Sequence, residues 1–233
     1  MSILRAVGDL HGCIDNRNRF PELPSYVEIC QELESDDYSV QLGDCGFEYR
    51  DLELVDSNKN RILLGNHCNY DIAFDYPHML GHYGVAELGP FSFFYIRGGF
   101  SLDKAYRVKH ERLTGQKSWW PEEELTQKQG KDAIDMYESV KPNIVLSHDT
   151  SSGIAFLIGN PDILTAFGIP RSFVGKTQSI LQQCFDIHQP ELHIFGHFHK
   201  DWEIILKGTH HICINERRFI DFDEQWNVVE KSK

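Results

Sequence analysis

Side chains that can bind metal ions gather behind short apolar runs in this 233-residue sequence. Five such runs end, and residues of metal-binding type follow at once: Asp9 and His11, Asp44, Asn66 and His67, His148, and His197 and His199. A single Asp or His after a strand is more often a cap, a turn former or a solvated group. Five coincidences favour one shared site, because the loops after the strands of an α/β sheet converge on one crevice.

The donor types and their spacing point to transition metals. Carboxylates, an amide oxygen and imidazoles form a mixed oxygen and nitrogen set, which suits Mn²⁺, Fe, Zn²⁺ or Ni²⁺ better than an all-oxygen Ca²⁺ cage. In Asp9-Leu10-His11 and His197-Phe198-His199 the outer residues are two positions apart. An extended backbone directs both of them to the same side, so each pair can grip one ion or straddle two.

The segments that must position these side chains have the patterns of strands and helices. Strands are predicted at residues 3–7, 38–42, 61–64, 93–97, 143–147 and 192–195. Helices are predicted at residues 121–140 and 176–187, the first opening on Pro121 and three glutamates that suit a helix start. Three alternating runs, residues 202–206, 210–214 and 217–221, predict antiparallel strands. The predicted class is therefore α/β with a strand-rich C-terminal part.

The composition is that of a globular protein, with 41% hydrophobic and 25% charged residues. It excludes a disordered or collagen-like chain. A net charge of −12 argues against stable binding to duplex nucleic acid, which needs Lys and Arg at the phosphates. Without repeats or linkers, residues 1–233 are expected to form one domain.

No signal peptide or apolar run of roughly 18 residues is present, and the six cysteines lack tight spacing. We therefore expect a cytoplasmic protein with reduced thiols and no membrane association.

The polar blocks, taken in order, carry a family resemblance. Gly8-Asp9-Leu10-His11-Gly12, Gly43-Asp44, Gly65-Asn66-His67, His148 and Gly196-His197-Phe198-His199 resemble the ordered motifs of the calcineurin-like metallophosphoesterases. The resemblance implies a four-layer αββα sandwich with mixed sheets and a metal site at the C-terminal ends of the strands. Residues 95–104 and 118–125 also resemble a subgroup common among phage and bacterial members.

The same resemblance implies a centre of two divalent transition metal ions. Mn²⁺ is expected first, with Fe, Zn²⁺ or Ni²⁺ as alternatives. One ion would be held by Asp9, His11 and His199, the other by Asn66, His148 and His197, and Asp44 would bridge them. A hydroxide bridging the metals would attack phosphorus in line. His67, which matches the family's non-ligand histidine, would act as the acid at the leaving oxygen or stabilise the transition state.

Two departures from the family pattern narrow the expected substrate. Protein phosphatases of the family continue the second block to a further Asp, where this chain has Phe47, and Cys68 stands where the third block usually has Asp or Glu. Glu48, Arg50 or Asp71 could replace the missing carboxylate or the family's phosphate-binding arginine through a different loop path. A protein phosphatase is therefore less expected than a phosphodiesterase or a small-molecule phosphatase. Cys45 and Cys68 are expected near the metals, as small hydrophobes or as redox-sensitive thiols.

The expected partner is a small phosphorylated substrate such as a nucleotide. Arg97, at a predicted strand end beside Gly98-Gly99, is the candidate phosphate contact, because a guanidinium matches phosphate bidentately; a surface arginine on a turn is the alternative. An alternative function is a catalytically inactive metal-binding or protein-binding module on the same fold. Since every expected ligand type and His67 are present, the hydrolase is favoured.

Overall fold

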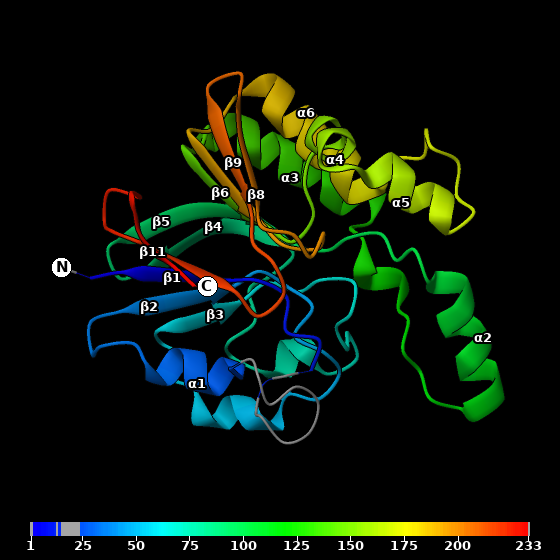
Figure 1. Cartoon of the computed structure of the whole chain (residues 1–233), viewed down its shortest axis with the longest axis horizontal. Coiled ribbons are helices and arrows are strands. Elements are labelled where there is room, and N and C mark those ends of the chain that lie inside the picture. The colour runs from blue at the N-terminus through cyan, green and yellow to red at the C-terminus, as the bar shows by residue number, and fades with distance from the viewer. Residues whose placement is uncertain (1, 13, 15–23, 233) are drawn as a thin grey trace.

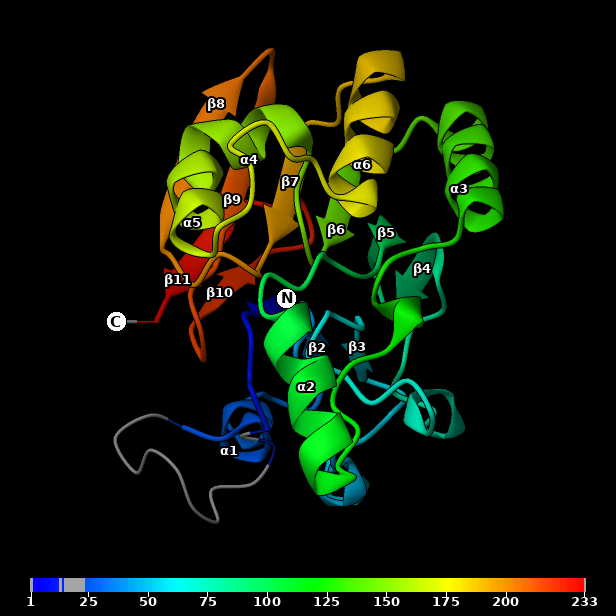
Figure 2. The same ribbon diagram turned by 90° about the vertical axis from the view of Figure 1, so that its right-hand side faces the viewer.

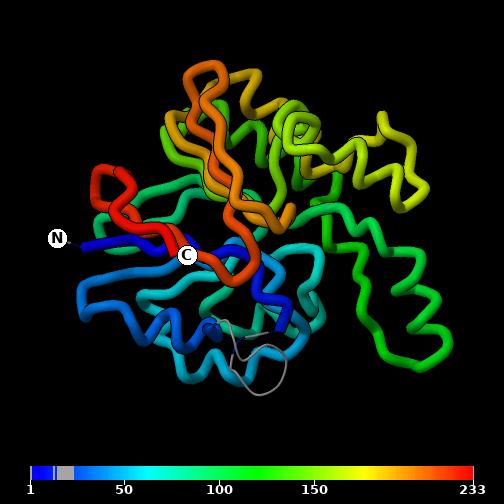
Figure 3. Tube along the Cα trace, in the orientation of Figure 1, coloured from blue at the N-terminus to red at the C-terminus, as the bar shows by residue number. Residues whose placement is uncertain are grey.

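The computed structural model describes residues 2–12, 14 and 24–232, and it places two mixed β-sheets face to face (Figure 1). One sheet has the order β11-β10-β1-β2-β3, with β1 at Leu4–Val7, β2 at Tyr38–Gln41, β3 at Asn60–Ile62, β10 at Phe219–Phe222 and β11 at Val228–Lys231. The other has the order β4-β5-β6-β7-β9-β8, with β4 at Tyr83–Leu88, β5 at Phe91–Ile96, β6 at Ile144–Ser147, β7 at Leu192–Phe195, β8 at Trp202–Leu206 and β9 at Thr209–Cys213. The trace in Figure 3 shows that segments from both chain ends lie together, because β1 pairs with β10.

Alternation along the strands builds the core between the two sheets. Leu4 and Ala6 of β1 belong to one buried cluster with Phe93 of β5 and Ile194 of β7. Val7, one residue further along β1, lies in the separate cluster beneath α1. Successive strand residues point to opposite faces, so the same short strand serves the sheet interface and an outer helical layer.

Helices cover the two outer faces (Figures 1 and 2). The short helix α1, Tyr26–Gln31, buries its apolar side with β1 and β3 on the first sheet. On the second sheet, α3 at Gln127–Val140 and α6 at Lys176–Ile187 bury their apolar sides with β5 and β6. Next to them, α4 at Ser152–Ile158 packs near the end of β7. The four layers confirm the predicted αββα sandwich.

The single helix predicted for residues 121–140 is wrong in its first turn. Pro121–Glu123 forms a separate 3₁₀ helix, and α3 begins only at Gln127. Thr126 causes the break: its side chain accepts a hydrogen bond from the N–H of Gln129, whose side chain accepts one in return from the N–H of Thr126. This capping box starts a new helix. Glu124 lies outside both helices and accepts hydrogen bonds at the start of α6.

The other predicted elements are present, with ends that differ by at most two residues, and α6 has the predicted bounds. Elements not predicted include β4 and the helices α1, α2 at Lys104–Thr114, α4 and α5 at Asn160–Ala166, as well as two further 3₁₀ helices, Arg50–Leu54 and Ala73–Asp75. Over the part of the chain that the structure describes, none of the helices has the length and apolar character to cross a membrane.

A neutral histidine pair, His193 of β7 and His211 of β9, is buried in the second sheet. The Oγ of Ser147 donates to the carbonyl of Asp149 and therefore accepts from Nε2 of His193 at 2.7 Å. Nδ1 of His193 is then an acceptor for the Nδ1–H of His211 at 3.1 Å. Burial lowers the pKa of His193 far below its ordinary value and lowers that of His211 to about 4.

This pair predicts a loss of stability in mild acid. Below pH 6.5 the unfolded chain takes up protons on these imidazoles, while folded His211 stays neutral down to pH about 4, so the free energy of unfolding falls as pH drops through that window. His211→Gln keeps a neutral donor and should flatten the profile by up to about 3 kcal/mol. Urea unfolding between pH about 4 and pH 6.5 measures the free energy of unfolding of the unchanged protein and of His211→Gln. The prediction is contradicted if this free energy depends on pH in the same way in both proteins.

Candidate metal centre

The polar residues that follow the strands lie together at one end of the sandwich. The loops after β1, β2 and β3 supply Asp9, Asp44 and Asn66, and those after β6 and β7 supply His148 and His197. Loops from the two sheets are in contact: the backbone N–H of His197 donates to both carboxylate oxygens of Asp9, at 3.0 and 3.1 Å. The site thus forms where the carboxyl ends of parallel strands from two sheets meet.

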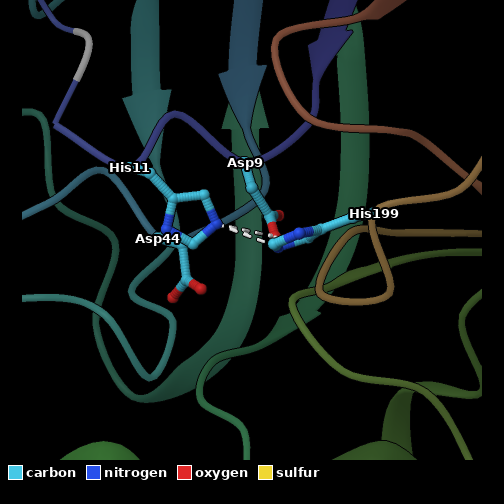
Figure 4. Close-up of side chains that lie close together, drawn as sticks. All are labelled: Asp9, His11, Asp44 and His199. Atoms are coloured by element: carbon cyan, nitrogen blue, oxygen red, sulfur yellow. Dashed lines mark hydrogen bonds and ion pairs between the residues drawn. The ribbon is translucent and has the colours of Figure 1, made fainter. Parts of the chain in front are cut away.

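One cluster consists of Asp9, His11, Asp44 and His199 (Figure 4), each offering one ligand atom within 4.8 Å of the others. The Nε2 atoms of His11 and His199 are 2.9 Å apart, and Nε2 of His199 lies 3.0 Å from Oδ2 of Asp9. Both carboxylates are buried, whereas the two imidazoles are partly exposed. The cluster therefore opens to solvent on its imidazole side.

A second cluster consists of Asp44, His148 and His197, again with ligand atoms within 4.8 Å of one another. Nε2 of His148 lies 3.3 Å from Oδ1 of Asp44 and 3.0 Å from Oδ1 of Asn66. A Cβ placed on Gly99 would stand 3.2–3.3 Å from atoms of Asn66, His148 and His197, so these three side chains surround one point. Asp44 belongs to both clusters.

These groups fit divalent metal ions by their donor chemistry. Nδ1 of His148 donates to the carbonyl of Leu42 at 2.8 Å, which leaves a lone pair on Nε2 that faces the oxygens of Asn66 and Asp44. Burial alone would raise the pKa of Asp44, but the surrounding imidazoles, His148 foremost, hold it well below its ordinary value. A cation can satisfy a buried carboxylate and several converging lone pairs at once.

The backbone is strained at the ligand positions. Non-glycine residues rarely adopt positive φ, yet His11, Asp44, His197 and His199 have φ of 48°, 54°, 67° and 50°. A Cβ on Gly65 would collide with Asp44 Oδ1 and His148 Nε2, so only glycine fits there. Conformations of this kind persist where the surrounding structure enforces them, and they cluster at functional sites.

A buried polar network orients Asn66 from behind. Nδ2 of Asn66 donates to Oγ of Ser101 at 3.1 Å, which turns Oδ1 toward His148. Arg107 donates to the carbonyl of Asn66 with both terminal nitrogens at 3.1 Å, and to Ser101 at 2.7 Å. Glu123 completes the network, accepting from Arg107 at 2.7 Å and from Ser101 at 2.6 Å. Ser101, Arg107 and Glu123 were not predicted as site residues.

Ser101→Ala should weaken metal binding without unfolding the protein. The amide of Asn66 loses the acceptor that fixes its orientation, while the ion pair between Arg107 and Glu123 remains. Loss of such an outer partner typically lowers metal affinity about 10–100-fold. Calorimetric titration of metal-stripped protein with Mn²⁺ measures this, with Ser92→Ala, at the exposed position of β5, as the matched control. Equal affinities in the two variants would contradict the positioning role.

His67 lies beside the two clusters and is a member of neither. Its backbone N–H donates to Oδ1 of Asp44 at 2.6 Å, and its ring centroid is 5.3 Å from that of His11. Burial lowers the pKa of His67, and the nearby charges of Asp44 and Asp103 oppose that effect. Asp103 was not predicted as a site residue, because it lies just before α2 and does not directly follow a strand.

The residues suggested as replacements for the missing motif side chains lie elsewhere. Asp71 forms an ion pair with Lys117 at 2.8 Å, and Glu48 and Arg50 are exposed. Phe47 packs against Trp120, with ring centroids 5.6 Å apart, so the position of the family's second Asp has a packing role here.

The hydrogen bonds of the Arg97 side chain are with residues outside the two metal clusters. Its side chain is buried and donates to Nδ1 of His82 at 2.8 Å, to the hydroxyl of Tyr70 at 3.0 Å and to the carbonyl of Glu122 at 2.5 Å. The surface-arginine alternative is therefore wrong. That Arg97 binds the phosphate of a substrate stays a prediction, which its hydrogen bonds to other residues do not favour.

Each cysteine that the structure describes is a free thiol, and Cys13 lies outside the described residues. Cys45 and Cys68 follow the ligand-bearing positions and are fully buried, with their Sγ atoms 3.7 Å apart. Cys68 also accepts from the N–H of Gly65 at 3.3 Å. The pair thus packs the two ligand loops together.

The sequence matches the model of the calcineurin-like phosphoesterase family over residues 4–201. The chain therefore belongs to this family, which places it in the class of phosphoric ester hydrolases. A search of functionally curated proteins finds none whose sequence matches significantly.

Solved structures share the fold at low sequence identity. The phosphopantetheinyl hydrolase of Mycobacterium tuberculosis superposes with a TM-score of 0.50 and 13% identity, over 93% of this chain and 90% of that one. A candidate 5′-nucleotidase from Staphylococcus aureus, solved in complex with α-ketoglutarate, gives a TM-score of 0.47 and 14% identity, over 100% of this chain. The present chain spans 53% of that protein's length.

Proposed function

We propose that this protein hydrolyses phosphate esters with two divalent metal ions held by the two clusters that share Asp44. The observation that carries the proposal is the convergence of five strand-end loops on one buried set of carboxylate, amide and imidazole groups. The ligands of one ion are Asp9, His11 and His199, those of the other are Asn66, His148 and His197, and Asp44 lies between them. Mn²⁺ is the proposed metal.

When bound, the ions supply an activated water nucleophile and offset negative charge on the phosphoryl oxygens. The chain's own groups keep the ligands in place for this chemistry. Asp9 is fixed by the N–H of His197, and Asp44 by the N–H of His67. Asn66 is fixed by Ser101 and Arg107. Such preorganised groups need no rearrangement as charge develops in the transition state.

His67 is the proposed acid. Its ring lies next to His11 at the open side of the site, and its side chain is free of both ligand clusters. From there it can donate a proton to the ester oxygen that leaves phosphorus, a contribution of typically 10²–10⁴-fold.

The proposed substrate is a phosphodiester or a small phosphorylated molecule such as a nucleotide, in the cytoplasm. Phe47, which packs against Trp120, stands at the position where a protein phosphatase of the family has its further Asp, and this supports the choice over a phosphoprotein. The free thiols of the described cysteines support the location.

Paired hydrolysis of bis-p-nitrophenyl phosphate and p-nitrophenyl phosphate by metal-stripped protein, with and without Mn²⁺, tests the proposal. Mn²⁺-dependent turnover is expected, and the ratio of the two rates separates a phosphodiesterase from a phosphatase. Stoichiometric metal binding with no turnover of either ester would instead favour a catalytically inactive module.

A further inference from the structure

A segment beside the metal centre carries a charge opposite to that of the whole chain. Residues 103–118, here called the basic arm, contain five Lys or Arg and two Asp or Glu, a net charge of +3 in a chain of −12. Helix α2 forms most of it and ends at Gly115, whose φ of +74° and N–H bond to the carbonyl of Glu111 close the helix. Figures 1 and 2 show α2 projecting from the sandwich at the end where β1 and β2 terminate.

The basic arm is fixed to the site at both of its ends. Arg107 is buried and donates to the carbonyl of the ligand residue Asn66. On the segment that follows the helix, Lys117 pairs with Asp71 at 2.8 Å and lies 5.0 Å from the ring of Trp120. These contacts hold the helix in one orientation relative to the metal centre.

The outer surface of the arm combines unpaired cations with exposed rings. Lys109 and Arg112 are exposed, and no described carboxylate forms an ion pair with either. Tyr106 is 69% exposed, and its ring centroid is 6.1 Å from that of His110, one helical turn further along. Neither the cations nor the tyrosine ring is buried in the fold.

We propose that the basic arm binds the backbone of single-stranded nucleic acid and directs one of its phosphates to the metal centre. Proteins that bind single strands combine cations along the backbone with aromatic rings on which bases stack. Lys109 and Arg112 supply the cations, and Tyr106 and His110 supply the rings. The rest of the chain has a net charge of −15, the −12 of the whole less the +3 of the arm, and repels a polyanion, so the arm is the local point of attraction.

This inference rests on the proposed function and names its substrate class. Hydrolysis of a phosphodiester in such a strand consumes one water: the bond from phosphorus to one sugar oxygen breaks, and phosphorus keeps the incoming oxygen. The products are a phosphate monoester end and a sugar hydroxyl, the latter taking up one proton.

Fluorescence anisotropy of a labelled oligothymidylate of about 12 nucleotides tests the inference. The double variant Lys109→Glu/Arg112→Glu should bind at least about tenfold more weakly than the unchanged protein, and the dependence of log K on log salt should be shallower by roughly 1.4, for two lost phosphate contacts. Tyr106→Ala should weaken binding by roughly 5- to 150-fold, with the salt dependence unchanged.

The matched control is Lys128→Glu/Lys131→Glu on α3, an equal charge change at two exposed helical positions. Circular dichroism and metal content establish that each variant is folded. Equal affinities of the arm and control variants, or no binding by the unchanged protein, would overturn the inference. A dimer that dissociates on Tyr106→Ala would also overturn it, by making the arm a protein interface. Hydrolysis of bis-p-nitrophenyl phosphate reports separately on the proposed function, so the two failures are distinguishable.

Discussion

Asp44→Asn is expected to lower kcat/KM for phosphate esters by about 10³-fold or more and to reduce the metal content. Asp44 is the group common to both clusters, and the change removes its charge while keeping its shape. A metal centre supplies several kcal/mol of transition-state stabilisation, which corresponds to losses of this size. Steady-state kinetics and elemental analysis of the purified variant provide the measurement.

The fold should survive this change. Asp44 has a φ of 54°, and asparagine is among the few residues that tolerate such a conformation. Asp75→Asn, the same change at an exposed position, is the control. A folded Asp44→Asn protein with near-normal rates would overturn the assignment of the site.

His67→Ala is expected to slow turnover by about 10²–10⁴-fold while metal content stays normal. The imidazole lies outside both clusters, and the hydrogen bond to Asp44 comes from the backbone, which the variant retains. His210→Ala, at a partly exposed position of β9, is the control.

The leaving group distinguishes two roles of His67. p-Nitrophenolate leaves readily without a proton, so an acid predicts a smaller defect for bis-p-nitrophenyl phosphate than for a nucleotide ester. An equal defect on both esters indicates charge stabilisation instead. Loss of the metals in His67→Ala would contradict the division of roles.

Sequence reasoning located the candidate ligand groups that the structure brings together, because their signal is local. A short apolar run followed by Asp or His marks the end of a strand, and parallel strands bring such ends together wherever they lie in the chain. His148 and Asn66 are 82 residues apart, yet their side chains meet at 3.0 Å. The pattern of apolar runs predicted the α/β class, whereas the four-layer sandwich was implied by the family resemblance of the motifs.

The supporting residues could not be found this way. Ser101, Arg107 and Glu123 act through contacts across a loop, α2 and a 3₁₀ helix, and none follows an apolar run as directly as the candidate ligands do. Arg97 shows the limit of the local signal: it follows a strand like the candidate ligands, but its side chain donates to Tyr70 and His82. Side-chain direction beyond a strand end depends on the packing of distant segments, which no local pattern encodes.

The central claim is that two ions share Asp44 and are both required for hydrolysis. Titration of metal-stripped protein with Mn²⁺, following bound metal and ester hydrolysis in the same samples, tests it most directly. We expect two equivalents bound per chain, with turnover rising as the second site fills. Saturation at one ion with full activity, or hydrolysis that is independent of metal, would contradict the account.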